Sequence, residues 1–198
     1  MLVLETPGTA QRAPAKGRIL ETANQLFYQD GILNVGVDRI IAQSSVTKAT
    51  FYKHYRSKDN LILEYVKSRR ADTETQVQSI IENAASPHDA VLGLLENIAS
   101  ELTKLDFRGC PFLNVVAEFP NPTHPVRLLI AEHRDWYNET LHNLMRSAGH
   151  PVSGDAADEI MLAKDGALAG GYAGDSIAAG AAMARVVNRV LAETIGTK

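Results

Sequence analysis

Cysteine is almost absent from this chain of 198 residues, in which Cys110 is the single copy. One cysteine cannot form an internal disulfide, and this usage suits a reducing compartment. No stretch approaches the roughly 18 consecutive apolar residues of a membrane-spanning helix. Residues 1–14 lack the basic start and apolar run of a secretory signal. These absences predict a cytoplasmic protein that spans no membrane.

Motifs of several enzyme classes are missing as well. Neither a phosphate-binding loop nor a dinucleotide fingerprint occurs. A helical di-metal enzyme needs a second Glu-x-x-His pair besides Glu139 and His142, and nothing in the sequence completes that set. A hydrolase using Cys110 and His133 is a further alternative, but no sequence signal supplies its oxyanion hole. The sequence therefore predicts no enzyme activity, no metal site and no cofactor.

Charge is distributed unevenly along the chain, although the formal net charge is only -3. Residues 1–70 contain 11 Lys and Arg against 6 Asp and Glu, whereas residues 71–198 contain 9 against 17. A basic first third joined to an acidic remainder indicates that one end meets a polyanion. Chance clustering of solvated charges is the alternative. Apolar residues make up 45% of the chain, enough for a core without disulfides or metals.

Apolar residues recur at helical spacing along most of the chain, and no segment shows the sustained alternation of a strand. After a predicted flexible arm at residues 1–15, the pattern indicates helices over about 16–30, 37–44, 47–55 and 58–84. Helices then open at Ser86-Pro87, Pro111 and Pro125, because proline is favoured in a first turn. Two final helices are expected over about 156–172 and 175–195. The sequence thus predicts an all-α fold of about nine helices.

The segment from Val37 to Lys58, VDRIIAQSSVTKATFYKHYRSK, carries the main functional prediction. Two short helices joined by a few residues form a helix-turn-helix, whose second helix enters the major groove of DNA. Thr47 is the expected N-cap of that second helix. Cations and hydroxyls suited to phosphates and base edges form its polar side: Lys48, Thr50, Tyr52, Lys53 and His54. An ordinary three-helix packing unit with a polar face is the alternative.

This stretch also carries a family resemblance. LFYQDG followed by GVDRIIAQSSVTKATFYKHYRSKDNLI resembles the N-terminal domain of the TetR family of transcriptional regulators, densely over residues 19–65. The most specific element is Phe51-Tyr52-x-x-Tyr55 followed by Ser57-Lys58-Asp59. Members usually have glycine, which tolerates a left-handed backbone, where Ser45 stands, and a small apolar residue where Ser44 stands. Ser45 can still serve in a turn with shifted local geometry, and neither serine is at an expected DNA contact.

The resemblance implies specific DNA contacts. The residues expected to read bases are Lys48, Ala49 and Tyr52, and Lys53 lies on the same polar side. The residues expected to hold phosphates are Thr47, Thr50, His54 and Lys58, with Arg39 as a supporting cation. Lys58 lies in the first turn of its helix, where its ammonium and the exposed N–H groups could grip one phosphate. Arg12, Lys16 and Arg18 could add contacts from the arm, or belong to a solvated tail.

The resemblance further implies a DNA-binding domain at residues 16–60 and a larger domain at 61–198 that binds a ligand and forms a homodimer through the last two helices. The final helix carries more apolar surface than one buried face needs: Ile177, Ala178, Ala181, Ala182, Val186, Val187, Val190 and Leu191. Burial within one chain is the alternative. A symmetric dimer would place two recognition helices roughly 34–36 Å apart and implies a palindromic operator in double-stranded DNA.

A small-molecule effector is the remaining expected partner, and its identity does not follow from the sequence. Aromatic side chains and polar groups, the usual make-up of such sites, give these candidates: Cys110, Phe112, Glu118, Phe119, His133, Trp136, Tyr137 and Tyr172. Cys110 is either a buried inert thiol or one activated at a helix N-terminus. The expected function is a repressor that the effector releases from DNA, with the helix from Lys58 carrying the movement.

Overall fold

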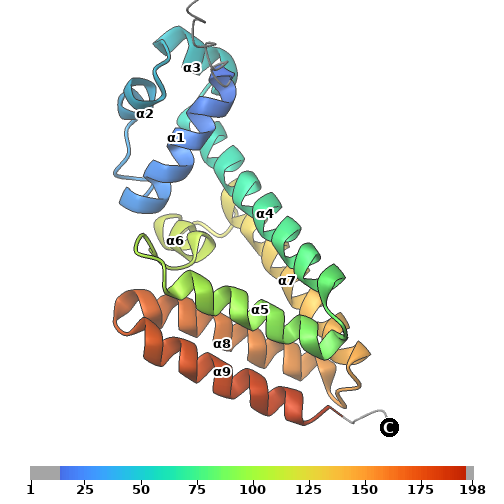
Figure 1. Cartoon of the computed structure of the whole chain (residues 1–198). Coiled ribbons are helices and arrows are strands. Elements are labelled where there is room, and N and C mark those ends of the chain that lie inside the picture. The colour runs from blue at the N-terminus through green and yellow to red at the C-terminus, as the bar shows by residue number, and fades with distance from the viewer. Residues whose placement is uncertain (1–13, 195–198) are drawn as a thin grey trace, which may run out of the picture.

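The computed structural model describes residues 14–194, and this range contains nine helices and no strand (Figure 1). The helices are α1 (Ala15–Asp30), α2 (Val37–Ser44), α3 (Lys48–Tyr55), α4 (Lys58–Asn83), α5 (Pro87–Leu102), α6 (Pro111–Glu118), α7 (Pro125–Ser147), α8 (Ser153–Ala173) and α9 (Ser176–Ala192). The predicted all-α fold is confirmed. Of the predicted arm, residues 1–13, including Arg12, lie outside the described range.

Several helices begin where capping chemistry predicts. Thr47 Oγ1 accepts a hydrogen bond from the backbone N–H of Thr50 at 3.1 Å, and Ser57 caps α4 in the same way. Ser86 caps α5, and proline occupies the first turn of α5, α6 and α7. The capping hydroxyls satisfy N–H groups that a helix leaves without partners at its start, and proline has no N–H group to satisfy there. The starts of α3, α4 and α5 therefore follow from local sequence.

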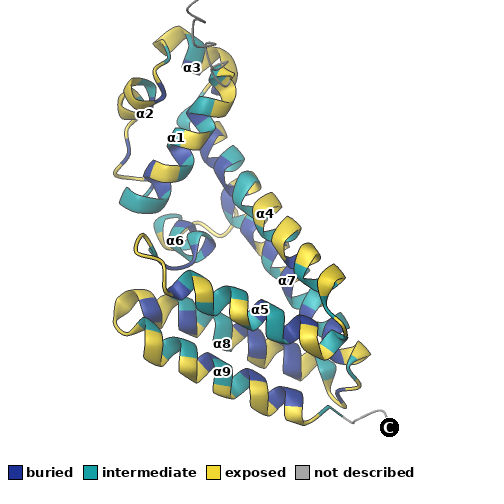
Figure 2. Ribbon diagram, viewed as in Figure 1, coloured by how far each residue is buried: buried dark blue, intermediate teal, exposed yellow. Residues whose placement is uncertain are grey.

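The first three helices pack around the beginning of α4. Ile19, Ile40, Phe51 and Leu61 are fully buried there. Figure 2 colours buried positions dark blue along the helices. The Tyr55 hydroxyl donates to the carbonyl of Lys16 at 2.9 Å, which ties the end of α3 to the start of α1. The helix-turn-helix thus rests on a core of its own, and this core continues into α6 and the start of α7.

The helices α5, α7, α8 and α9 form a second body at the other end of α4. α4 and α7 lie alongside one another, α5 packs on α9, and α8 and α9 lie at the end farthest from α3 (Figure 1). α8 approaches α5 closely at Gly171, where a Cβ atom would stand 2.6 Å from Leu102 Cδ2. No helix within residues 14–194 has the length and apolar character that crossing a membrane would require.

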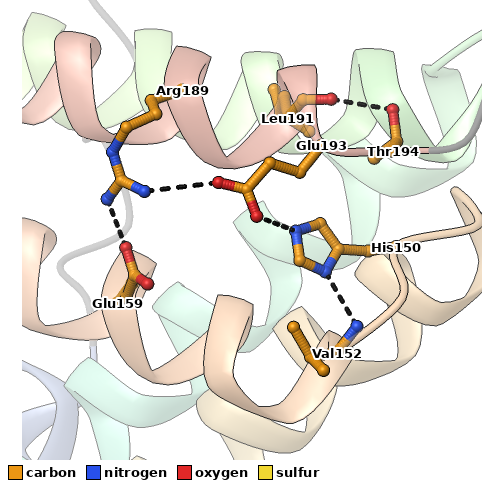
Figure 3. A network of polar contacts seen from close by, with 7 residues as sticks. All are labelled: His150, Val152, Glu159, Arg189, Leu191, Glu193 and Thr194. Atoms are coloured by element: carbon orange, nitrogen blue, oxygen red, sulfur yellow. Dashed lines mark hydrogen bonds and ion pairs between the residues drawn. The ribbon is translucent and has the colours of Figure 1, made fainter.

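A polar network fixes the end of α9 against the α7–α8 connection (Figure 3). The buried His150 ring accepts at Nδ1 from the N–H of Val152 at 3.3 Å, and its Nε2 lies 3.7 Å from the Glu193 carboxylate. Arg189 contacts Glu193 at 3.4 Å and pairs with Glu159 on α8. These contacts join the end of α9 to α8 and to the α7–α8 connection, beside the apolar packing of the two helices.

Candidate functional site

α3 presents most of the predicted DNA-binding residues on one surface. Phe51 and Tyr55 are buried, whereas Tyr52 is 43% exposed. The exposed side chains of this helix and its N-cap are Thr47, Lys48, Ala49, Tyr52, Lys53 and His54, with Thr50 half-buried. The helix therefore has a packed side and an open side that offers cations, hydroxyls and an amphipathic ring.

The turn before α3 shows how two serines replace the residues that are usual there. Ser45 adopts the left-handed conformation, with φ 53° and ψ 49°. Ser44 is buried, and its hydroxyl donates to the carbonyl of Ile40 at 2.7 Å, so its polarity is satisfied inside the chain. Arg18 donates to the carbonyls of Ser44 and Ser45 at 3.2 and 3.3 Å. Arg18, expected in the arm, therefore braces this turn from α1, a role that local sequence patterns do not reveal.

The two predicted contacts outside α3 have protein partners. Lys58 donates from Nζ to the carbonyl of Ile32 at 2.6 Å, and burial lowers the pKa of its ammonium against an opposing effect of Glu118. Arg39 is exposed on α2 and lies 2.7 Å from the Asp30 carboxylate. The structure thus places the Lys58 ammonium against the α1–α2 loop, whereas Arg39 remains at the surface.

Two adjoining cavities lie between the helices of the second body and α6. The first, about 350 Å³, is bounded by α4, α5, the α5–α6 loop, α7 and α8, with the end of α1 and the start of α6 also in its wall. The second, about 320 Å³, lies among α6, α7 and α8. Both are lined by Cys110, Phe112, His133, Tyr137 and Lys164.

Four of the eight predicted ligand-binding residues line these cavities: Cys110, Phe112, His133 and Tyr137. The other four lie elsewhere. Phe119 packs on His124 with ring centroids 4.7 Å apart, and Trp136 reaches the cavities only through its stack on His133 at 5.7 Å. Tyr172 is 44% exposed and packs on Phe107. Glu118 binds backbone N–H groups of the α1–α2 loop.

Burial perturbs the chemistry of His133 in the cavity wall. Its ring is 6% exposed and stacks on Phe112 with centroids 4.0 Å apart. Its Nδ1 is buried and has no hydrogen-bond partner within the described chain. Burial, assisted by the positive charges of Lys164 and Arg70, lowers the pKa of His133 to about 4. The imidazole is therefore neutral at physiological pH.

A charged cluster that the sequence analysis did not single out completes the wall. Lys164 Nζ lies 2.7 Å from the Asp165 carboxylate and 5.1 Å from the Tyr137 ring centroid. Arg134 pairs with the same carboxylate from α7. The signal available in the sequence was a Lys-Asp pair within the small and apolar residues of α8. That signal does not say which side of the helix the pair occupies.

α6 connects the cavities to the helix-turn-helix. The Glu118 carboxylate accepts from the N–H groups of Ile32 and Leu33 at 2.9 and 2.6 Å. Just before α6 begins, the Tyr28 hydroxyl accepts from the N–H of Arg108 and donates to the carbonyl of Gly109 at 3.0 Å. Both ends of this short segment are therefore attached to α1 or to the loop that follows α1.

The fold and the surface of α3 define an all-helical regulator with an N-terminal helix-turn-helix, and comparisons with known proteins agree. The family model described as "Bacterial regulatory proteins, tetR family" matches residues 19–65. The crystal structure of SCO4454, a TetR-family transcriptional regulator from Streptomyces coelicolor, is 34% identical, covers 91% of this chain and 95% of that chain, and superposes with a TM-score of 0.88. The chain belongs to the TetR family of transcriptional regulators.

Curated relatives are more distant and match over shorter stretches. The HTH-type transcriptional repressor DhaR from Mycobacterium sp. (strain GP1) is 28% identical over 116 residues, which are 59% of this chain and 58% of the relative. The HTH-type transcriptional regulator LmrA from Bacillus subtilis (strain 168) is 24% identical over 133 residues, or 64% of this chain and 71% of that protein. This chain thus spans less than two thirds of the length of DhaR. Both relatives are transcriptional regulators of the helix-turn-helix type.

Proposed function

We propose that the chain is a repressor that binds a palindromic operator as a homodimer and is released from DNA by a small molecule. The observation that carries this proposal is the placement of α6, which lines the second cavity and holds the α1–α2 loop through Glu118. A molecule that moves α6 would therefore move the support of the helix-turn-helix. The repressor activity named for DhaR is consistent with this direction of control.

The proposed DNA contacts are the exposed residues of α3 and its N-cap. Lys48 and Tyr52 are suited to base edges, while Thr47, Thr50, Lys53 and His54 are suited to phosphates. Lys48 lies 3.8 Å from Asp38, and both side chains are largely exposed. An exposed pair of this kind contributes little, so phosphate or guanine can replace the carboxylate. Arg39, in its exposed pair with Asp30, is a supporting phosphate contact on the same grounds.

The proposed dimer surface is the outward side of α8 and α9. Val187, Val190 and Leu191 are buried within the chain, so only part of the apolar surface predicted for α9 is available to a partner. Leu162 on α8 is 67% exposed, and Ile177 at the start of α9 is 82% exposed. Further along α9, Ala178, Ala181 and Ala182 are also exposed. Small side chains allow helices of two subunits to approach closely. This surface fits a symmetric four-helix contact.

Control by the effector is proposed to follow from two arrangements of α6 and α4. A ligand that binds one arrangement more tightly shifts the population towards it and changes operator affinity by the same free energy. α4 begins beside the helix-turn-helix and runs along the first cavity, so it can move together with α6. Both α4 and α6 therefore transmit ligand binding in the cavities to the helix-turn-helix.

The test uses the full chain and DNA fragments from upstream of its own coding region. Fluorescence anisotropy at low ionic strength should show a preference for one fragment over random duplex, and analytical ultracentrifugation should show a dimer. Lys48→Ala should alter the sequence preference of that binding. Arg146→Ala, at the exposed end of α7, is the control and should bind like the parent. Equal binding to every duplex, or a monomer at micromolar concentration, would contradict the proposal.

A further inference from the structure

The two cavities differ in the charge of their walls. The first is lined by Arg69, Lys104 and Lys164 together with three carboxylates, Asp72, Glu101 and Asp106. The second is lined by Arg127, Arg134 and Lys164 but by a single carboxylate, Asp165. Because His133 is neutral, it adds no charge to either wall. The first wall is therefore balanced, and the second has an excess of positive charge.

The excess lies around Asp165. This carboxylate accepts from Lys164 at 2.7 Å and also pairs with Arg134, so one negative charge serves two cations. The side chains of Lys164 and Asp165 are only 12% and 16% exposed, which limits compensation of this pair by water and salt, whereas Arg134 is 43% exposed. Arg127 donates to the carbonyl of Phe119 at 2.8 Å, a contact that leaves its charge uncompensated. An anion entering the second cavity would complete this set.

The remaining wall of the second cavity is apolar. Its apolar residues are Phe112, Leu113, Val116, Ile130, Ala131 and Met161. The His133 ring extends this surface, and its Nδ1 lacks a partner although it is buried. Buried polar atoms normally have partners, so this atom, on a ring that lines both cavities, is available to a hydrogen-bond partner from outside the chain.

We propose that the second cavity binds an amphipathic organic acid, with its carboxylate against Lys164 and Arg134 and its apolar body against Phe112 and Met161. This inference rests on the proposed effector role of the cavity. It excludes organic cations, which would meet an excess of like charge. It also disfavours neutral molecules of the same shape, which leave the excess charge uncompensated.

The test compares three probes of one shape: phenylbutyrate, its neutral amide phenylbutyramide and the cation phenylbutylammonium. Trp136 is the only tryptophan, and its ring lies 5.7 Å from that of His133, so its fluorescence excited beyond the phenyl absorption reports binding. Isothermal titration calorimetry supplies the dissociation constants. Phenylbutyrate should bind at least about tenfold more tightly than the amide, as expected for a charge-assisted contact. The cation should bind more weakly than both.

Substitutions test which side chains cause the preference for phenylbutyrate over its amide. Lys164→Met should reduce the preference for the carboxylate to less than about threefold without weakening the amide, and Lys164→Arg should keep the preference. Lys104→Met, which removes a cation from the first cavity only, is the matched control and should behave like the parent. Arg134→Gln should lower the preference as well, and it serves if Lys164→Met does not fold, as judged by circular dichroism.

Outcomes for the ligand class and for the proposed function are separable. Equal or tighter binding of the amide or cation, failure of all three probes to bind, or a preference that survives both Lys164→Met and Arg134→Gln overturns the inference. Selective phenylbutyrate binding that leaves operator affinity unchanged supports the ligand class and contradicts effector control. Operator binding by a dimer without anion selectivity supports the DNA-binding function and contradicts the ligand class.

Discussion

Positive charge is handled differently at the two ends of the molecule. Lys48 and Lys53 are exposed to solvent on the open side of α3. In the cavity wall, the largely buried Lys164 and the partly exposed Arg134 pair with one carboxylate, that of Asp165. Exposed charges cost little and act over a Debye length, which suits a polyanion. Buried charges are costly without close partners, so they favour a ligand that completes their set. Exposed cations therefore suit attraction over a distance, whereas a shielded cluster favours a close partner.

Removing a buried side chain beneath α3 should have the largest effect on stability, because this side chain holds the exposed surface of α3 in place. Phe51 is fully buried, and Phe51→Ala should cost about 3–5 kcal/mol of unfolding free energy. Operator binding should be lost, and phenylbutyrate binding should weaken as well, because the core that contains Phe51 extends to Phe112 and Ile130 in the wall of the second cavity. Urea titration followed by circular dichroism measures the change.

Lys53→Ala is the matched control on the exposed side of the same helix and should stay within about 0.5 kcal/mol of the parent. A Phe51→Ala protein with parental stability would contradict the packing of α3 on α1 and α4.

Removing the contact between Glu118 on α6 and the α1–α2 loop should have the next largest effect on stability. Glu118→Ala leaves the N–H groups of Ile32 and Leu33 without their acceptor and should cost about 1–3 kcal/mol. Glu118→Gln keeps one carbonyl oxygen as an acceptor and should cost less. The unfolding free energy and the effect of phenylbutyrate on operator affinity are both measured. If Glu118→Ala keeps the full response to phenylbutyrate, transmission does not pass through this contact.

The contrast between the ends also explains what the sequence could predict. The helix-turn-helix is specified by residues close together in the chain, such as the Thr47 cap and the alternation of buried Phe51 with exposed Tyr52, so its existence and surface followed from local pattern. The left-handed Ser45 marks the limit of this approach. Its conformation is supported by Arg18, which lies 27 positions earlier, and by a hydroxyl contact of Ser44.

The cavities are formed by residues from separate helices. For this reason only four of the eight predicted ligand-binding residues line them. Composition favoured aromatic residues, and Phe112, His133 and Tyr137 do line the cavities. Composition could not place Glu118 on the α1–α2 loop or bring Lys164 next to Arg134, since those contacts join distant parts of the chain. Single-sequence periodicity gives the face of a helix but not its neighbour.

The buried, neutral His133 should make the unfolding free energy depend on pH. Its pKa is lowered to about 4 by burial, whereas an unfolded chain has a histidine pKa of about 6.5. The stability supplied by the neutral ring is therefore present above about pH 6.5 and falls as the pH drops towards 4, because only the unfolded chain takes up the proton. Between pH 7 and pH 5, the parent should lose about 1–2 kcal/mol more than His133→Phe.

Urea unfolding at fixed protomer concentration measures this difference, since dimer stability depends on concentration. His88→Gln removes an exposed histidine and is the control. A parallel decline of the parent and His133→Phe would show that the buried ring does not titrate in this way.

Two lysines near the DNA-binding end give the finest comparison, because one is exposed and the other contacts the protein. Lys53→Ala should reduce the slope of log affinity against log salt concentration by about 0.9, the effect of losing one phosphate contact, with little change in stability. Lys58→Ala should leave the slope nearly unchanged and cost about 1 kcal/mol, because Lys58 donates to the Ile32 carbonyl. Operator titrations across a salt series and urea unfolding separate the two effects. If Lys58→Ala lowers the slope as much as Lys53→Ala, its ammonium leaves Ile32 for a phosphate when DNA binds, and the α1–α2 loop that Glu118 holds then takes part in DNA binding itself.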